Sequence, residues 1–329
     1  MNFNSELMKK LSDCISPSGR ENNIRELIIN EIKDFADDIN VDALGNLIVR
    51  KAGKGKKIMF SAHMDQIGFM ITHVDEKGFL RFTNIGGLHP KEILGQRVVF
   101  DNEYEGIICS EKLEDKEKIA MNKLFIDVAI TDSNILKENF LIGDICVFKT
   151  DYYETDNCVM CKAADDRAGC YVLIEAIKNH PNTDNDVYYV FSVQEEVGLR
   201  GAKTAGYSVN PDIAIALDVT ATGDSLDGTK MDVKLNSGAA IKLMDKSIIT
   251  HTNIKNLLTN LAIKNNIKYQ YEILEFGGTD AGAIHTLRDG VPSGVISIPT
   301  RNIHSSGEIF SKEDIKECLK LTLAVCNSK

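Results

Sequence analysis

Apolar and polar residues follow two different rhythms along the chain. Before residue 68 and after residue 161, apolar runs that suit buried strands alternate with segments whose apolar residues recur every three or four positions, as in amphipathic helices. This alternation predicts an α/β fold with a mostly parallel sheet and helices on both of its faces. The expected helices are residues 20–36, 165–177, 198–205, 253–264 and 312–326, and the expected strands are residues 46–50, 57–62, 186–193, 212–217, 269–275 and 294–298.

Between these two parts the pattern changes to short strand-like runs separated by Gly, Asn, Asp and charged residues, without a long helical segment. The expected strands here are residues 68–74, 78–83, 97–101, 105–109, 124–130 and 144–149. We therefore expect residues 68–161 to form an all-β insertion in an α/β domain made of residues 1–67 and 162–329. Ser18 and Glu21 have the spacing of a capping box at the start of the first predicted helix.

The composition is that of an ordinary soluble globular protein, with 43% hydrophobic and 26% charged residues among 329. No apolar run has transmembrane length, and the N-terminus lacks a basic region followed by an apolar one, so we expect a cytoplasmic protein without a membrane partner. The net charge of −10 argues against nucleic acid as a partner.

Eight cysteines are scattered through apolar segments, which is typical of reduced, buried thiols in a cytosolic enzyme. Cys158 and Cys161 form a lone C-x-x-C motif. Since the chain has no second pair and no thioredoxin-like context around this one, a structural role is favoured over metal binding or redox chemistry.

The residues best suited to chemistry follow the predicted strands of the α/β part. In open α/β sheets ligands bind at the carboxyl ends of strands, so these side chains can converge although they are far apart in sequence. Two imidazoles with several carboxylates suit zinc, cobalt or manganese better than calcium or magnesium. Carboxylates in this number could hold two ions, at the separation of ~3.5–4 Å found in two-metal hydrolases. The set predicts a metal hydrolase and consists of His63, Asp165, Glu195, Glu196, Asp218 and His304.

Each member of this set also has a simpler interpretation. An isolated Glu195–Glu196 pair would suit the start of a helix, where negative charge interacts favourably with the helix dipole. A single histidine beside a strand usually packs or lies at the surface. The joint occurrence at strand ends favours the metal site, in which one glutamate could bind a cation while its neighbour moves a proton. Asp65 lies two residues after His63, where it could accept the second N–H of the imidazole and fix its tautomer.

Six ordered motifs resemble those of one family, the dinuclear metallo-aminopeptidases that include glutamyl, deblocking and tetrahedral aminopeptidases. Some of its members are labelled cellulase M or endoglucanase. The segment from Ile85 to Val98 in the insertion is also similar to this family. The six motifs are Ala62–Phe69, Lys162–Cys170, Gln194–Gly201, Ala216–Thr220, Gly277–Ala283 and Ser297–Ser305.

The resemblance implies a zinc-aminopeptidase-like α/β domain interrupted by a barrel-like dimerisation domain, with dimers that assemble into a dodecamer. It implies two divalent ions per subunit, zinc or cobalt, with manganese as a further candidate. It assigns Asp165 to bridge both ions, His63 and Asp218 to one ion, Glu196 and His304 to the other, Glu195 as general base and Asp65 to hold His63.

The predicted activity is hydrolysis of N-terminal residues from peptides, through a metal-bridging water that Glu195 activates. Gly277, Gly278, Thr279 and Asp280 are expected to line the substrate cleft, with a simple tight turn as the alternative. Asn302 and Ala221 stand where the family usually has Tyr and His, which concerns the substrate side-chain pocket. The alternatives are another metal-dependent hydrolase on the same site, such as a deacylase, carboxypeptidase or glucanase, and a vestigial site with an interaction role.

Overall fold

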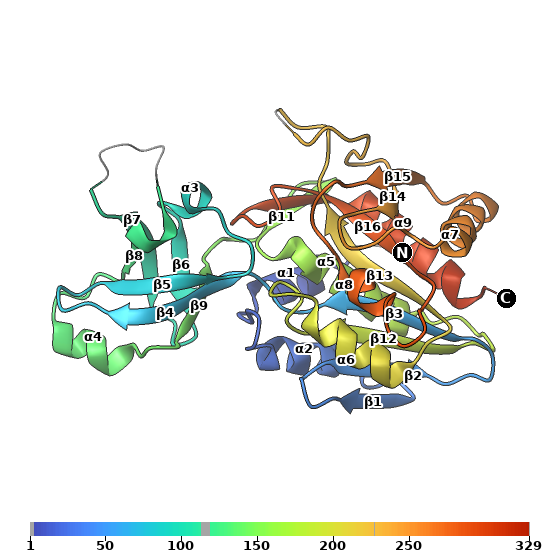
Figure 1. Ribbon diagram of the computed structural model, residues 1–329, viewed down its shortest axis with the longest axis horizontal. Coiled ribbons are helices and arrows are strands. Elements are labelled where there is room, and N and C mark those ends of the chain that lie inside the picture. The colour runs from blue at the N-terminus through green and yellow to red at the C-terminus, as the bar shows by residue number, and fades with distance from the viewer. Residues whose placement is uncertain (1–2, 113–118, 227, 329) are drawn as a thin grey trace.

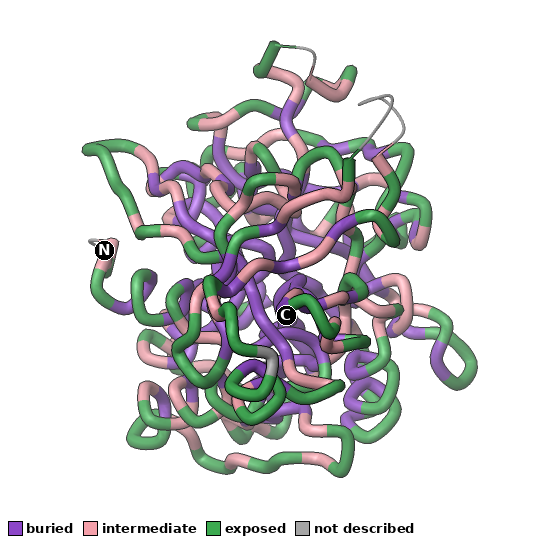
Figure 2. The backbone as a smooth tube through the Cα atoms, turned by 90° about the vertical axis from the view of Figure 1, so that its left-hand side faces the viewer, coloured by how far each residue is buried: buried purple, intermediate pink, exposed green. Residues whose placement is uncertain are grey.

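Figure 1 shows the computed structural model, in which a small β-barrel lies beside a larger α/β domain. The structure describes residues 3–112, 119–226 and 228–328. Within these ranges, no helix combines the length and the apolar character needed to cross a membrane. Figure 2 shows that buried backbone runs through the middle of the molecule while exposed loops surround it.

One large mixed sheet forms the centre of the α/β domain. Its middle strands β12, β3, β13 and β16 are parallel to one another, as predicted, whereas the strands added at both edges pair in antiparallel fashion. In spatial order the strands are β1 (Asp38–Val41), β2 (Leu47–Lys51), β12 (Asp186–Ser192), β3 (Lys57–His63), β13 (Ile213–Thr220), β16 (Ser293–Arg301), β17 (Glu308–Ser311), β11 (Cys158–Cys161) and β10 (Tyr153–Glu154), with β14 (Ala239–Met244) and β15 (Tyr269–Ile273) branching from β16.

Helices cover both faces of this sheet, as the sequence predicts. Successive residues of β3 point to opposite faces, so Ile58 and Phe60 join the core beneath α5 while Met59 joins the separate core beneath α6. The helices are α1 (Ser5–Asp13), α2 (Asn22–Ile32), α5 (Ala164–Lys178), α6 (Arg200–Val209), α7 (Thr252–Lys264), α8 (Asp280–Ile284) and α9 (Lys312–Cys326).

The insertion is a closed barrel in which every neighbouring pair of strands is antiparallel. Phe69 packs edge-on against Phe82 and Phe148 at its centre. Its strands in barrel order are β4 (Gly68–Val74), β5 (Leu80–Ile85), β8 (Leu124–Asp127), β7 (Glu105–Ser110), β6 (Arg97–Phe100) and β9 (Ile145–Phe148); the short helices α3 (Pro90–Ile93), α4 (Ser133–Asn139) and η2 (Met121–Lys123) lie between them.

Two local expectations differ from the structure. The segment 153–161, which we assigned to the insertion, instead extends the large sheet, because β11 pairs with β17. Ser18 and Glu21 do not form a capping box: the Ser18 hydroxyl donates to Asp65, and Glu21 accepts from the N–H groups of Gly19 and Gln194. Ser18 is thus engaged by a residue far away in the sequence, and Glu21 accepts one local and one distant backbone N–H instead of that of Ser18.

All eight cysteines are free thiols. Burial raises the pKa of Cys161 to about 12 and also raises the pKa of Cys158, so both thiols are protonated at neutral pH. A structural role for this pair remains a prediction.

Candidate metal centre

The predicted ligands converge at the carboxyl end of the parallel strands. His63 is the last residue of β3, and Asp218 lies within β13 rather than after it. Asp165 stands at the start of α5, where the peptide bond to Asp166 is cis. The remaining members come from connections, with Glu195 and Glu196 in the turn after β12 and His304 between β16 and β17.

Asp165 occupies the middle of this cluster. Its Oδ1 lies 2.9 Å from His63 Nε2 and its Oδ2 lies 3.3 Å from His304 Nε2, so each oxygen faces a different imidazole. Glu196 Oε2 lies 3.1 Å from His304 Nε2, and Asp218 Oδ1 lies 3.9 Å from His63 Nε2. This arrangement suits a carboxylate that bridges two ions.

Two triplets of ligand atoms lie within 4.8 Å of one another, one from His63, Asp165 and Glu196 and one from His63, Asp166 and Asp218. Asp166 was not among the predicted ligands, although it directly follows Asp165 in the sequence. It is fully buried, one of its oxygens accepts the N–H of Gly169, and the other has no hydrogen-bond partner. The second triplet therefore contains Asp166 where the prediction combines Asp165 with His63 and Asp218.

The charges of the cluster fit divalent cations. Burial raises the pKa values of Glu195 and Asp218 well above their ordinary range, and neighbouring carboxylates raise them further. Burial lowers the pKa of His304, but Glu196 and Asp165 raise it to about 12. Carboxylates that favour protons and imidazoles that favour positive charge mark a site that lacks cationic charge, and nitrogen and oxygen donors of this kind bind zinc, cobalt or manganese. Glu196 Oε1, buried without a partner, is a further donor that an ion would satisfy.

Asp65 holds the backbone of the neighbouring turn rather than the imidazole of His63. Its carboxylate accepts the N–H of Glu195 at 3.0 Å, the N–H of Glu196 at 3.3 Å and the Ser18 hydroxyl at 2.6 Å. His63 Nδ1 lies 3.2 Å from the Asp65 carbonyl oxygen but 3.6 Å from its carboxylate. The backbone carbonyl of Asp65 is therefore the better acceptor for the second N–H of the imidazole, which is a role that we had expected of the carboxylate.

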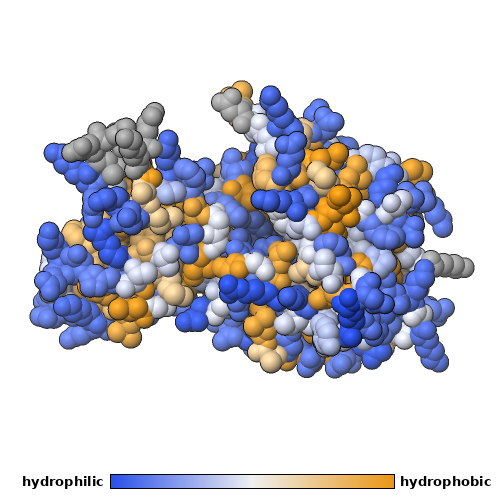
Figure 3. All heavy atoms as spheres, viewed as in Figure 1, coloured by the Kyte–Doolittle hydropathy of each residue, from blue (hydrophilic) through white to orange (hydrophobic). Residues whose placement is uncertain are grey.

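A cavity of about 830 Å³ opens onto the cluster and is lined by both domains. The molecular face in Figure 3 is hollowed between the barrel and the α/β domain. Gly87 and Glu92 come from the barrel, and a Cβ atom on Gly87 would lie 3.1 Å from His304 Nδ1. The other domain contributes Asp165, Glu195, Glu196, Asp218 and His304, together with Ala221, Gly277, Gly278 and Asn302.

Thr279 and Asp280 do not line this cavity. Asp280 is buried beneath the cluster, where its carboxylate accepts from the hydroxyl groups of Ser61 and Ser192, the latter at 2.6 Å. Of the four residues expected to line the cleft, Gly277 and Gly278 line the cavity, whereas Thr279 and Asp280 are buried in the domain.

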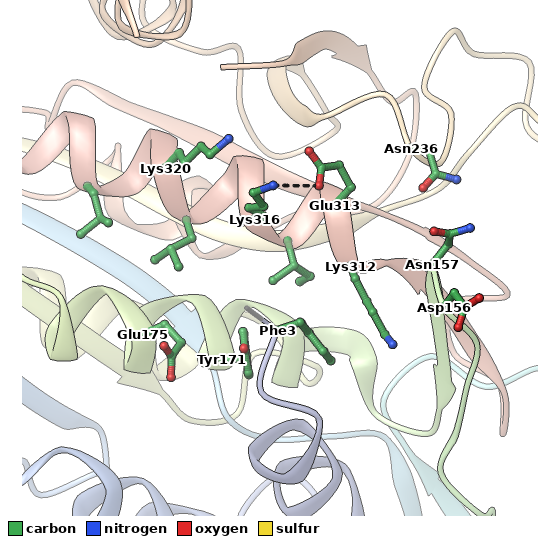
Figure 4. Close-up of a pocket in the computed structure, with 13 residues that line it drawn as sticks. Phe3, Asp156, Asn157, Tyr171, Glu175, Asn236, Lys312, Glu313, Lys316 and Lys320 are labelled. Atoms are coloured by element: carbon green, nitrogen blue, oxygen red, sulfur yellow. Dashed lines mark hydrogen bonds and ion pairs between the residues drawn. The ribbon is translucent and has the colours of Figure 1, made fainter. Parts of the chain in front are cut away.

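A second cavity, of about 470 Å³, lies beside α5 and α9 (Figure 4). Lys312, Lys316 and Lys320 line it, and each is paired with a glutamate, as Figure 4 shows for Lys316 and Glu313. None of the predicted metal ligands reaches this cavity. The ionisable groups that could hold a metal are therefore gathered at the first cavity, and this arrangement on an α/β fold indicates a metal-dependent hydrolase.

Comparison with known proteins narrows this class. Residues 45–321 match the M42 glutamyl aminopeptidase family. A provisionally named aminopeptidase from Acetivibrio thermocellus is 49% identical over 323 residues, which cover 98% of each chain. An aminopeptidase from the archaeon Desulfurococcus kamchatkensis has a solved structure that superimposes with a TM-score of 0.93 at 37% identity, covering 98% of this chain and 94% of that one.

The TET1 peptidase of Pyrococcus horikoshii, described as assembling into a tetrahedron or a large octahedral shell, has a TM-score of 0.89 at 35% identity and covers 98% of this chain and 99% of its own. The chain thus belongs to the M42 glutamyl aminopeptidase family and is a metal-dependent aminopeptidase. This membership confirms the predicted family and disfavours the deacylase, glucanase and non-catalytic alternatives.

Proposed function

We propose that the protein removes N-terminal residues from peptides at a two-metal site in which Glu195 is the general base. The observation that carries this proposal is the different placement of the two adjacent glutamates. Glu196 belongs to a triplet of ligand atoms with His63 and Asp165, and its Oε2 lies 3.1 Å from His304 Nε2. Glu195 belongs to neither triplet, its Oε2 lies 3.9 Å from His63 Nε2, and it lines the cavity together with Glu196. Asp65 binds both backbone amides, which supports a fixed separation between the two carboxylates.

Zinc or cobalt would suit the donor set, with manganese as a further candidate. Such ions would acidify a water molecule and favour negative charge on the scissile carbonyl oxygen. Glu195 takes the proton of the attacking water and delivers it to the leaving amine. The proposed ligands are His63, Asp165, Glu196, Asp218 and His304.

The peptide would enter through the cavity between the two domains. Gly277 and Gly278 line it, and the absence of side chains at these positions allows the peptide backbone to approach closely. The acidic cluster at the inner end attracts the α-ammonium group of a substrate, which favours action at the N-terminus. Ala221 and Asn302 also line the cavity, where they would help to shape the space for the substrate side chain.

The test compares Glu195→Gln with Glu196→Gln. Loss of a general base typically lowers the rate by about 10²–10⁴-fold, so we expect Glu195→Gln to lose aminoacyl-amide hydrolysis to this extent while it keeps the metal content of the wild type. Glu196→Gln should instead lose metal, as measured by atomic spectrometry after dialysis. Near-normal turnover by Glu195→Gln would show that the base is assigned to the wrong residue.

We also propose that the barrel mediates self-association into dimers and a dodecamer. Helix α4 and the loop after it expose Ile135, Leu141 and Ile142, of which Leu141 and Ile142 are 64% and 71% exposed. Apolar side chains grouped in this way favour a protein partner, and the assembly of the Pyrococcus horikoshii relative supports a second copy of the chain in that role.

A further inference from the structure

Glu308 is a buried carboxylate that contacts two of the metal-ligand residues through their backbones. It is the first residue of β17, is 1% exposed and lies four residues after His304. Its Oε1 accepts the N–H of His304 at 2.7 Å, and its Oε2 accepts the N–H of Asp165 at 2.9 Å. A single side chain thus joins two ligand-bearing segments that are far apart in the sequence.

The chemistry of these two contacts requires a carboxylate. Both partners are N–H donors, and a carboxyl group is the side-chain group that can offer one acceptor oxygen to each of them. In a glutamine, the amide nitrogen would turn two N–H groups toward the N–H of either Asp165 or His304. Each oxygen is engaged by one of the two segments, so a change of this side chain affects both segments together.

The same two segments need to be held, because their local conformations are unusual. His304 has a φ of +63°, in the left-handed region that residues with a side chain rarely adopt. Ala163, which precedes α5 and the Asp165 turn, also has a positive φ of +54°. Tertiary contacts must stabilise such conformations, and Glu308 supplies a contact to each segment at the residue that carries the ligand.

We infer that Glu308 is a positioning residue that sets the distance between Asp165 and His304 and thereby determines how tightly the centre binds metal. This inference rests on the metal site of the proposed function. Asp165 Oδ2 and His304 Nε2 lie 3.3 Å apart, and both are donors directed to the same region of the cluster. Since metal–ligand distances hold to within about ±0.2 Å, a small relative movement of the two segments changes the affinity.

The chain offers a matched control in Asp314. This aspartate of α9 is equally buried, and its two oxygens accept the N–H groups of Asn236 and Gly238 at 2.8 Å and 2.7 Å. It therefore makes the same kind of double contact, but to a loop that carries none of the proposed ligands. Asp314→Asn and Glu308→Gln both replace a carboxyl group by an amide. They differ in the segments that the carboxyl group contacts, because only Glu308 contacts segments that carry proposed ligands.

The experiment measures Zn²⁺ affinity by competition with a chromophoric chelator, the visible absorption spectrum after loading with Co²⁺, and the melting temperature of the metal-free protein. Both variants should lower the melting temperature. Only Glu308→Gln should weaken Zn²⁺ binding, by about 10–100-fold, as is typical when a group that orients metal ligands is lost, and only this variant should change the Co²⁺ spectrum. Glu308→Asp keeps two acceptor oxygens and should weaken binding less than Glu308→Gln does.

Wild-type Zn²⁺ affinity in Glu308→Gln, or an equal loss in Asp314→Asn, would overturn the inference. If Glu308→Gln does not fold, Glu308→Asp decides the question, since wild-type affinity in that variant would also overturn it. Failure of the proposed function would give a different result from failure of this inference. The wild-type protein itself would then bind no Zn²⁺, or Glu195→Gln would remain active.

Discussion

Gly87 is the point at which the barrel approaches the metal centre, and a single added methyl group tests this contact. In Gly87→Ala the new Cβ would lie 3.1 Å from Nδ1 and 3.2 Å from Cε1 of His304, whereas ordinary contacts begin at 3.4 Å. The φ of Gly87 is not positive, so alanine can adopt its backbone conformation. The substitution therefore acts by steric contact alone.

The size of the effect follows from this geometry. Relief of the contact requires a movement of about 0.3 Å, which exceeds the tolerance of about ±0.2 Å for metal–ligand distances. Overpacking costs about 1–3 kcal/mol, and about 1.4 kcal/mol corresponds to a tenfold change in affinity. We expect Zn²⁺ binding to weaken about tenfold. Because the His304 side chain is 33% exposed and can yield, the melting temperature of the metal-free protein should fall by less than about 3 °C.

The assay is the chelator competition with Gly307→Ala as its control. A Cβ at Gly307 would lie 3.7 Å from Met160 Sδ, an ordinary contact on the same loop as His304. The control should keep wild-type affinity. If Gly87→Ala binds Zn²⁺ as tightly as the wild type, or if both variants lose affinity equally, the barrel does not constrain the position of His304.

Two further predictions concern stability in acid and assembly. Burial lowers the pKa of His180 to about 4 from a value of 6.5 in the unfolded chain, so the unfolded state binds more protons between these values and stability falls as the pH drops from 6.5 to 4. His180→Gln should remove this pH-dependent contribution, which is about 1 kcal/mol after allowance for solvent screening at a half-buried site. Denaturant titrations at pH 7.0 and 4.5 measure the loss of unfolding free energy between the two pH values. An equal loss in the variant and the wild type would contradict the role given to His180. For the assembly, light scattering should give the mass of a large oligomer, and Leu141→Glu with Ile142→Glu should reduce it; a monomeric wild type would rule the proposed dodecamer out.

The sequence predicts the elements whose signals are local and repeated. The helix at residues 312–326 has the bounds predicted for it, and the barrel strands follow from short runs between turn residues. Likewise, the proposed ligands converge because they lie at or near the ends of buried strands, where topology rather than local sequence brings them together. The period of the apolar residues is sufficient to predict these elements, and the position of the polar residues after the predicted strands is sufficient to predict that they converge.

Other features depend on partners that are distant in the sequence. Strand β14 carries Lys242, which is 1% exposed because Glu272 and Asp245 lie 2.6 Å and 3.2 Å from its ammonium group. A lysine in an apolar run gives no indication of such partners. Strand β17 is short and begins with a charged residue, Glu308, so its pattern does not distinguish it from a loop. In both cases tertiary contacts overcome the local preference of the sequence.

The prediction for Asp65 was incomplete for the same reason, and the correction explains how so many carboxylates can share one site. Asp65 and Glu308 are buried acids whose oxygens are engaged by backbone N–H groups, and those N–H groups belong to Glu195, Glu196, Asp165 and His304. Since these oxygens are already hydrogen-bonded, neither carboxylate has to serve as a metal ligand. Glu196, by contrast, lines the cavity and keeps a buried oxygen, Oε1, that has no hydrogen-bond partner. Around the site, Asp65 and Glu308 thus hold the backbone, while acids such as Glu196 remain able to bind a cation, and this difference depends on which backbone N–H groups the fold directs at each side chain.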